Sequence, residues 1–145
     1  MPEQETVERA QEDAREGKSP STQAGEFVRE EMHHVREGKH GANSPQQAIA
    51  IGLSKARRAG VKLEAPKGPT SIREKAEHDI ATGENPQHKT SRRRSRATSR
   101  ALKKQPRSTA SRQALSQQAK KSSAKRGKRV RSAAALKAAR TRKTA

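Results

Sequence analysis

Basic side chains that could neutralise phosphate dominate the C-terminal part of the chain. No Asp or Glu follows Glu84, and residues 85–145 contain 21 Lys and Arg. Each phosphate that such a side chain neutralises releases a condensed counterion from a nucleic acid, without any reading of bases. We therefore predict nucleic-acid binding, with DNA favoured over RNA, through the following residues: Lys89, Arg92, Arg93, Arg94, Arg96, Arg100, Lys103, Lys104, Arg107, Arg112, Lys120, Lys121, Lys125, Arg126, Lys128, Arg129, Arg131, Lys137, Arg140, Arg142 and Lys143.

A second group of side chains has the donor types of a metal site. It consists of His33, His34, His40, Glu30, Glu31 and Glu37. On a helix, His33 and Glu37 would share one face, and so would Glu30 and His34. His33 would project opposite the apolar stripe, and nothing in the sequence supplies the closed shell of a structural zinc site. The pattern is more typical of a solvated helix face, so we predict no metal.

Patterns typical of catalysis are absent from the sequence. The chain has no cysteine, so disulfides and thiolate chemistry are excluded. It contains no Gly-rich phosphate loop and no nucleophile with a nearby base. We therefore expect a non-enzymatic protein that uses no cofactor.

Charge and apolar content differ between the two parts of the chain. Residues 1–65 carry 10 basic and 11 acidic groups, net −1, whereas residues 66–145 carry 24 and 4, net +20. Only 28% of the chain is hydrophobic, and Phe27 is its one aromatic residue. Low hydrophobicity with high net charge is typical of disordered segments and of nucleic-acid binders. We predict a mainly α protein with a small helical head, extensive disorder and a basic, conditionally helical tail.

Helical periodicity places the head within residues 21–65. Apolar residues recur at helical spacing from Ala24 to Val35, and a second helix is predicted from Pro45, with Ser44 as its N-cap. Gly60 is expected to end that helix, with Val61 folding back as an apolar contact. Two helices joined by a short connection predict an antiparallel hairpin.

The apolar content of this hairpin is marginal for independent stability, because few large side chains must offset the entropy of ordering the chain. We expect a loose hairpin, or one completed by self-association through an apolar set: Phe27, Val28, Met32, Ile49 and Leu53.

The hairpin is flanked by segments of different character. Residues 1–20 predict an acidic helix or arm, exposed or fraying because Val7 is its only large apolar residue within the helix. Residues 66–88 predict a linker with one short helix, begun by a capping box of Ser71 and Glu74. Residues 89–145 form the basic tail. Its helical candidates, 91–105, 108–126 and 130–142, have little to bury and are expected to gain order when phosphates neutralise them.

Residues 34–60 carry the element Lys39-His40-Gly41 and the block Gln47-Ala48-Ile49-Ala50-Ile51-Gly52-Leu53-Ser54-Lys55-Ala56-Arg57. This segment resembles a small bacterial family of uncharacterised function, whose members carry a Lys-His-Gly element followed by a Gln-Ala-Ile-Ala-Ile-(Ala/Gly)-Leu-Ser-x-Ala-Arg block. The resemblance covers under a third of the chain. It implies a bacterial, cytoplasmic protein and supplies no activity. The tail separately resembles histone-like basic tails in composition alone.

Together these features favour a sequence-nonspecific DNA-binding protein of the nucleoid-associated, histone-like kind, in the bacterial cytoplasm. The N-terminus lacks the apolar run of a secretory signal, and no stretch approaches the ~20 apolar residues of a membrane span. We expect no membrane partner. The alternative is a stress-response or adaptor protein that acts through the helical head, with a tail that contacts RNA or serves solubility.

Overall fold

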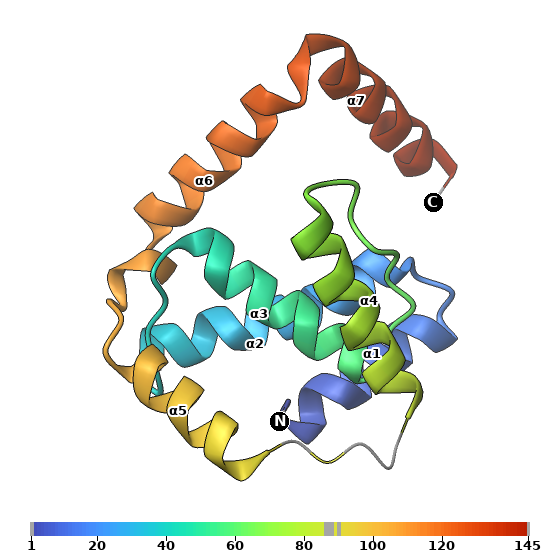
Figure 1. Ribbon diagram of the computed structural model, residues 1–145. Helices are drawn as coiled ribbons and strands as arrows, with labels where there is room; N and C mark the ends of the chain where they lie inside the picture. Colours follow the sequence, from blue (N-terminus) through green and yellow to red (C-terminus); the bar gives the residue numbers. More distant parts are fainter. Residues whose placement is uncertain (1, 86–88, 90, 145) are drawn as a thin grey trace. The chain divides into compact units, whose positions relative to one another are not determined.

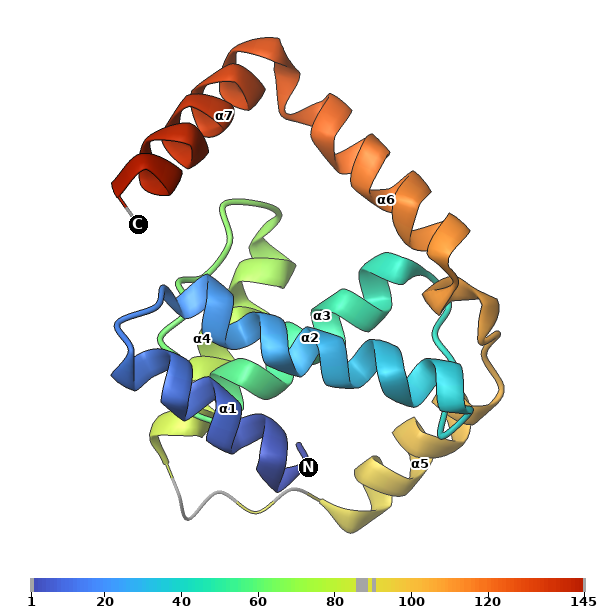
Figure 2. The same cartoon turned by 180° about the vertical axis from the view of Figure 1, so that it is seen from behind.

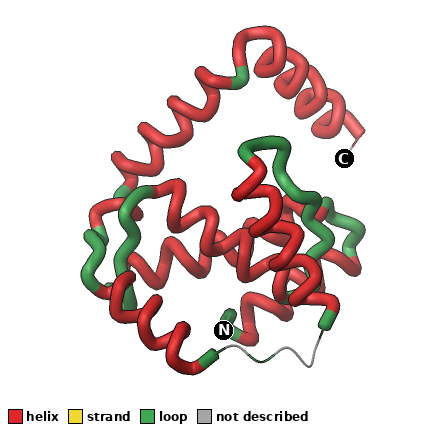
Figure 3. The backbone as a smooth tube through the Cα atoms, in the orientation of Figure 1, coloured by secondary structure: helices red, strands yellow, loops and turns green. Residues whose placement is uncertain are grey.

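The computed structural model describes residues 2–85, 89 and 91–144, and within these ranges the chain is mainly helical, with no strand (Figure 3). The prediction of a mainly α protein is confirmed. By its internal contacts the chain divides into two compact units, Met1–Ala110 and Ser111–Ala145, which we call the first and second units. The first unit therefore extends past Lys89, where the sequence placed the start of the basic tail.

Helix α2 (Pro20–Glu37) is the centre of the first unit, and both α1 (Gln4–Arg15) and α3 (Pro45–Arg58) pack against it (Figures 1 and 2). The core beneath them is small. Its buried members are Ala10, Ala24, Phe27 and Ala56. Because three of these four are alanines, the helix backbones can approach one another closely in this core.

The expectation that the N-terminal helix is exposed or frays is wrong. Helix α1 docks on α2 through two small residues, Thr6 and Ala10, which are 1% and 4% exposed. Polar contacts add to this packing, because Arg9 Nε donates to Glu26 Oε2 on α2 at 2.8 Å. A single valine would not hold this helix, but small residues combined with charge pairing between the helices do so.

The two helices predicted within residues 21–65 are present as α2 and α3, and Gly52 allows them to approach closely. A Cβ atom at position 52 would lie 2.7 Å from Val28 Cα and 3.0 Å from the Phe27 carbonyl oxygen. The predicted start of α3 is also confirmed. Pro45 is its first residue, and Ser44 Oγ accepts a hydrogen bond from the Gln47 amide at 3.2 Å.

Helix α3 ends as the sequence predicts. Gly60 has φ +90°, and its amide donates to the Arg57 carbonyl at 3.0 Å, while the Val61 amide donates to Ala56 at 3.1 Å. This pair of hydrogen bonds is a Schellman motif. It folds Val61 back against the core cluster.

Helix α4 (Thr70–Glu84) packs on α3, but not in the predicted way. The predicted capping box is wrong, because the helix begins at Thr70 with Pro69 as its N-cap and no side-chain cap bond. Ser71 therefore lies inside the first turn. Ile72 is 54% exposed, so the helix does not dock through a continuous apolar stripe.

A buried carboxylate joins α4 to α3. Asp79 is 1% exposed and accepts hydrogen bonds from Ser54 Oγ at 2.6 Å, Arg58 Nε at 2.9 Å and Lys75 Nζ at 2.7 Å. Burial raises the pKa of Asp79, but these three donors outweigh burial and the net pKa is lowered. The charge on Asp79 therefore stabilises the contact between α3 and α4.

Helix α5 (Arg92–Lys103) and the turn η1 (Ser108–Ala110) complete the first unit. The last turn of α5 and the segment between α5 and η1 cover the loop that follows α2. The Gly41 amide donates to the Leu102 carbonyl at 2.9 Å, and the Ala42 amide donates to Pro106 at 3.2 Å. A Cβ at Gly41 would clash with the backbone of Gln105, so this approach requires glycine.

The second unit consists of α6 (Arg112–Lys125) and α7 (Gly127–Thr144). Ser111 caps α6 by accepting from the Ala114 amide at 3.2 Å, and Gly127, with φ +70°, turns the chain between the helices. No residue of α6 is buried, and every described side chain of α7 is exposed. These helices form from local propensity and capping rather than around a core.

The prediction that Phe27 and Met32 take part in self-association is wrong, whereas for the half-buried Val28, Ile49 and Leu53 it stays a prediction. Phe27 and Met32 are 0% and 7% exposed within the first unit, so neither is available to a second copy. Within the same chain, α1 packs against α2 of the hairpin and α4 packs against α3. Within the described ranges, no helix combines the length and apolar character needed to cross a membrane.

We predict opposite effects for alanine at two glycines. Gly52→Ala should lower the free energy of unfolding by about 1–3 kcal/mol, because the new methyl overpacks the contact between α2 and α3. Gly25→Ala is the matched control, since nothing lies within 4 Å of a Cβ there. It should stabilise by about 0.5–1 kcal/mol through helix propensity. Urea denaturation measures both, and equal stabilisation by the two variants would contradict the close approach.

A pH-dependent loss of stability is predicted for Asp79→Asn. At pH 7 this variant should lose about 1.5–3 kcal/mol, the range for hydrogen bonds to a charged group. Because the folded pKa of Asp79 is lowered, its contribution is full above the unfolded pKa, about 3.9, and fades as pH falls through the folded value. The difference from the parent protein should therefore shrink below about pH 4. Glu77→Gln, on the exposed side of α4, should change stability little at either pH.

Candidate functional site

All 21 basic residues predicted to contact phosphate are exposed. In the first unit, Lys89, Lys104 and Arg107 lie in connecting segments, and Arg107 packs beside Gly38. The others of that unit lie on α5: Arg92, Arg93, Arg94, Arg96, Arg100 and Lys103. The second unit carries Arg112, Lys120, Lys121 and Lys125 on α6, Arg126 after it, and Lys128, Arg129, Arg131, Lys137, Arg140, Arg142 and Lys143 on α7. The structure therefore distributes these residues over three helices rather than gathering them into one pocket.

The structure contains a cluster of buried charges on α2 that was not predicted from the sequence. Glu30 and Glu31 are 5% and 0% exposed. The expectation of a solvated helix face is wrong for these two carboxylates, although it holds for the exposed pair His33 and Glu37, which lie 2.9 Å apart. One sequence signal could have found Glu31. It lies four residues after Phe27 and four before Val35, and therefore on the apolar stripe itself.

The end of α2 brings His40 back over this cluster. Gly38 has φ +78°, the Lys39 amide donates to the His34 carbonyl at 3.0 Å, and the Gly38 amide donates to Val35 at 3.2 Å. These bonds close a Schellman turn that reverses the chain. As a result, His40 Nε2 lies 3.1 Å from Glu31 Oε1. On a straight continuation of α2, these two positions would be about 13.5 Å apart along the helix axis.

Lys55 of α3 is the main cation of the cluster. Its Nζ lies 2.8 Å from Glu31 Oε2 and 3.1 Å from Glu30 Oε1. Burial lowers the pKa of Lys55, but the two carboxylates outweigh burial and raise it. The ammonium group is therefore charged in the folded protein, and it joins α3 to α2 electrostatically.

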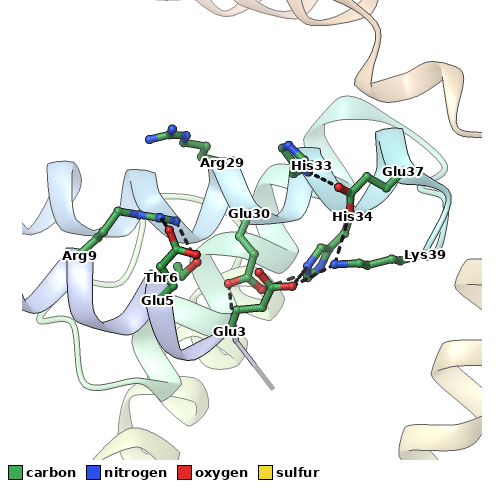
Figure 4. A pocket seen from close by; sticks show the side chains of 10 residues that line it. All are labelled: Glu3, Glu5, Thr6, Arg9, Arg29, Glu30, His33, His34, Glu37 and Lys39. Carbon is green, nitrogen blue, oxygen red and sulfur yellow. Dashed lines mark hydrogen bonds and ion pairs between the residues drawn. The ribbon is translucent and has the colours of Figure 1, made fainter.

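The N-terminal residues complete the cluster from a third side (Figure 4). The Glu3 amide donates to Glu30 Oε2 at 3.0 Å, and Glu3 Oε1 pairs with His34 Nε2 and Lys39 Nζ, each at 2.9 Å. His34 and Lys39 lower the pKa of Glu3 to about 2. Burial raises the pKa of Glu30, but hydrogen bonds from the Glu3 amide and Lys55 outweigh it. An open polar pocket lies on this face, lined in part by Glu3, Glu30, His34 and Lys39.

Comparison with known proteins identifies no relative of the chain. No family model, no curated protein and no solved structure matches it. The resemblance of residues 34–60 to a bacterial family therefore remains a prediction, as does the division at residues 20, 65 and 88. Any functional assignment rests on the charges and contacts described above.

Removal of the shared cation should be costly. Lys55→Met should lower the free energy of unfolding by about 3–5 kcal/mol, because it leaves two buried carboxylates without their ammonium partner. Lys62→Met is the control, since Lys62 is exposed and has the same side chain to lose. Calorimetric or urea-induced unfolding at pH 7 measures the difference. Equal stability of the two variants would show that Lys55 does not compensate the buried charge.

Proposed function

We propose that the protein binds nucleic acid without sequence preference, through the basic residues from Lys89 to Lys143, and that it performs no catalysis. One observation carries the proposal: all 21 basic residues of this stretch are exposed, in a stretch that contains no carboxylate side chain. The acids that could neutralise them internally all lie at or before Glu84. Phosphates are the abundant cellular anions that such an array fits.

Duplex DNA is the ligand that we favour. Proteins that bind single strands stack bases on aromatic side chains, and the one aromatic residue of this chain, Phe27, is 0% exposed. Nothing aromatic is therefore presented to an unpaired base. Phosphate contacts position a protein on a duplex without reading its sequence, so binding is nonspecific. This activity fits a nucleoid-associated, histone-like role in a bacterial cytoplasm.

The basic helices are conditionally ordered in this proposal. Their side chains repel one another, because like charges at i, i+4 destabilise an isolated helix. The helices bury nothing that would offset this repulsion in α6 and α7. Phosphates that neutralise the cations remove the repulsion and add contacts, so helix content rises when DNA binds.

The salt dependence of DNA binding tests the proposal. If about eight to ten phosphates are contacted, log affinity against log salt should have a slope of about −7 to −9. Replacing four cations of the second unit, Lys120, Lys121, Lys125 and Arg126, by Gln should reduce the steepness by about 3 to 4. Fluorescence anisotropy with a labelled duplex of random sequence measures both proteins between about 50 and 200 mM salt.

A control variant that loses the same number of positive charges distinguishes the loss of phosphate contacts from the loss of net charge. It replaces four exposed cations of the first unit, Arg15, Arg29, Lys62 and Lys67, by Gln. The slope for this control should stay close to that of the parent protein. Weak binding that is insensitive to salt, or an equal change in both variants, would contradict the proposed interface. Stronger binding to duplex RNA than to DNA would keep the interface and overturn the preferred polymer.

A further inference from the structure

Three side chains of the buried cluster have the geometry of a metal site. One ligand atom each from Glu31, His34 and His40 lies within 4.8 Å of the other two. Two imidazoles and a carboxylate are the protein donors of many three-ligand zinc sites, in which water or another small ligand takes the fourth position. All three residues come from one helix end and its returning turn, so the donors are positioned by local structure.

The Glu31 carboxylate is the second, independent observation. It is 0% exposed, and neither oxygen has an aligned hydrogen bond among the described residues. Lys55 Nζ and His40 Nε2 lie 2.8 and 3.1 Å away, close enough for charge attraction but outside hydrogen-bonding geometry. A fully buried carboxylate without aligned donors is costly. A cation coordinated by Oε1 would satisfy it, while Lys55 remains on Oε2.

The tautomer of His40 is also compatible with a metal ion beside Glu31 Oε1. Its Nδ1 lies 3.0 Å from the Gly41 carbonyl oxygen, which can only accept, so Nδ1 carries the proton. In the neutral imidazole, Nε2 then directs a lone pair toward Glu31 Oε1 at 3.1 Å. Two acceptor atoms at this separation need either a proton or a metal ion between them. Two ligands on a tetrahedral zinc with bonds of 2.0–2.1 Å lie about 3.3 Å apart, close to the observed distance.

The outer partners match those of metal ligands. A ligating histidine commonly donates its other ring nitrogen to a carbonyl or carboxylate, which fixes its orientation. His40 has the Gly41 carbonyl in this role, and His34 Nε2 has Glu3 Oε1 at 2.9 Å. The net charge of the cluster also favours a cation. The carboxylates of Glu3, Glu30 and Glu31 carry three negative charges, whereas Lys39 and Lys55 carry two positive charges, so the net charge is −1 when both imidazoles are neutral.

We propose that Glu31, His34 and His40 bind a divalent transition-metal ion of the Zn²⁺ type. Two imidazole donors favour this class over Mg²⁺ and Ca²⁺, which prefer oxygen ligands. One of the three ligands, His34, also lines the open polar pocket beside Glu30. This site is independent of nucleic-acid binding, because none of its residues belongs to the basic stretch.

Cobalt provides a direct probe. Full-length protein, freed of nucleic acid by nuclease and of metal by chelator, should bind one equivalent of Co²⁺ and develop the visible absorption of tetrahedral coordination by nitrogen and oxygen. Zn²⁺ should displace Co²⁺ and abolish this absorption, and calorimetry of Zn²⁺ binding should give the same stoichiometry. His34→Ala and His40→Ala should each weaken Zn²⁺ binding by more than about 100-fold, beyond the 10–100-fold typical of losing an outer partner.

His33→Ala is the matched control, because His33 neighbours the site but is exposed and offers no ligand to it. Its affinity for Zn²⁺ should equal that of the parent protein. Circular dichroism shows whether each variant folds. If a histidine variant does not fold, Glu3→Gln tests the site instead, because it keeps all three ligands and removes only the outer partner of His34. That variant should weaken binding by about 10–100-fold. Absence of Co²⁺ absorption at millimolar metal, or equal weakening by His33→Ala, would overturn the proposal.

Discussion

The fold of the first unit depends on pairing its buried carboxylates with cationic side chains. Glu30, Glu31 and Asp79 are almost inaccessible to water, and a buried charge is tolerated only when it is paired. Both main partners come from α3: Lys55 reaches the α2 acids, and Arg58 reaches Asp79 on α4. Helix α3 is therefore held between two acidic sites by cations one turn apart. The apolar core, built largely from alanines, adds close packing to this electrostatic frame.

The same constraint separates the two kinds of basic residue in this chain. Lys55 and Arg58 are committed to carboxylates inside the fold, whereas the stretch after Glu84 contains many cations and no Asp or Glu. A near-neutral N-terminal part can fold around its charges, but an acid-free stretch leaves its charges to external anions. This contrast is the physical basis for placing nucleic-acid binding in the C-terminal part rather than on the helical head.

Local signals were readable from the sequence, and contacts distant in sequence were not. Ser44 with Pro45, and Gly60 with Val61, set the ends of α3 through bonds to near neighbours, so their residue types were sufficient. The docking of α1 and α4 depends on pairings across many residues, which composition does not encode. Glu31 lay on the apolar stripe and was assigned to solvent by its charge alone. The partner that makes its burial tolerable, Lys55, lies 24 residues further along. The exposure of the basic tail residues, by contrast, follows from their composition and was predictable.

The loop after α2 has a consequence for the protein's biosynthesis. The amides of Gly41 and Ala42 find their acceptors on Leu102 and Pro106, and Arg36 Nε donates to the Ala110 carbonyl at 2.9 Å. Those acceptors leave the ribosome some 60 to 74 residues after their donors. The nascent head can form α1 to α4 early, but the turn that carries His40 stays open on one side until residue 110 emerges. Premature termination before that point would therefore release a head in which this turn lacks the contacts that residues 102–110 provide.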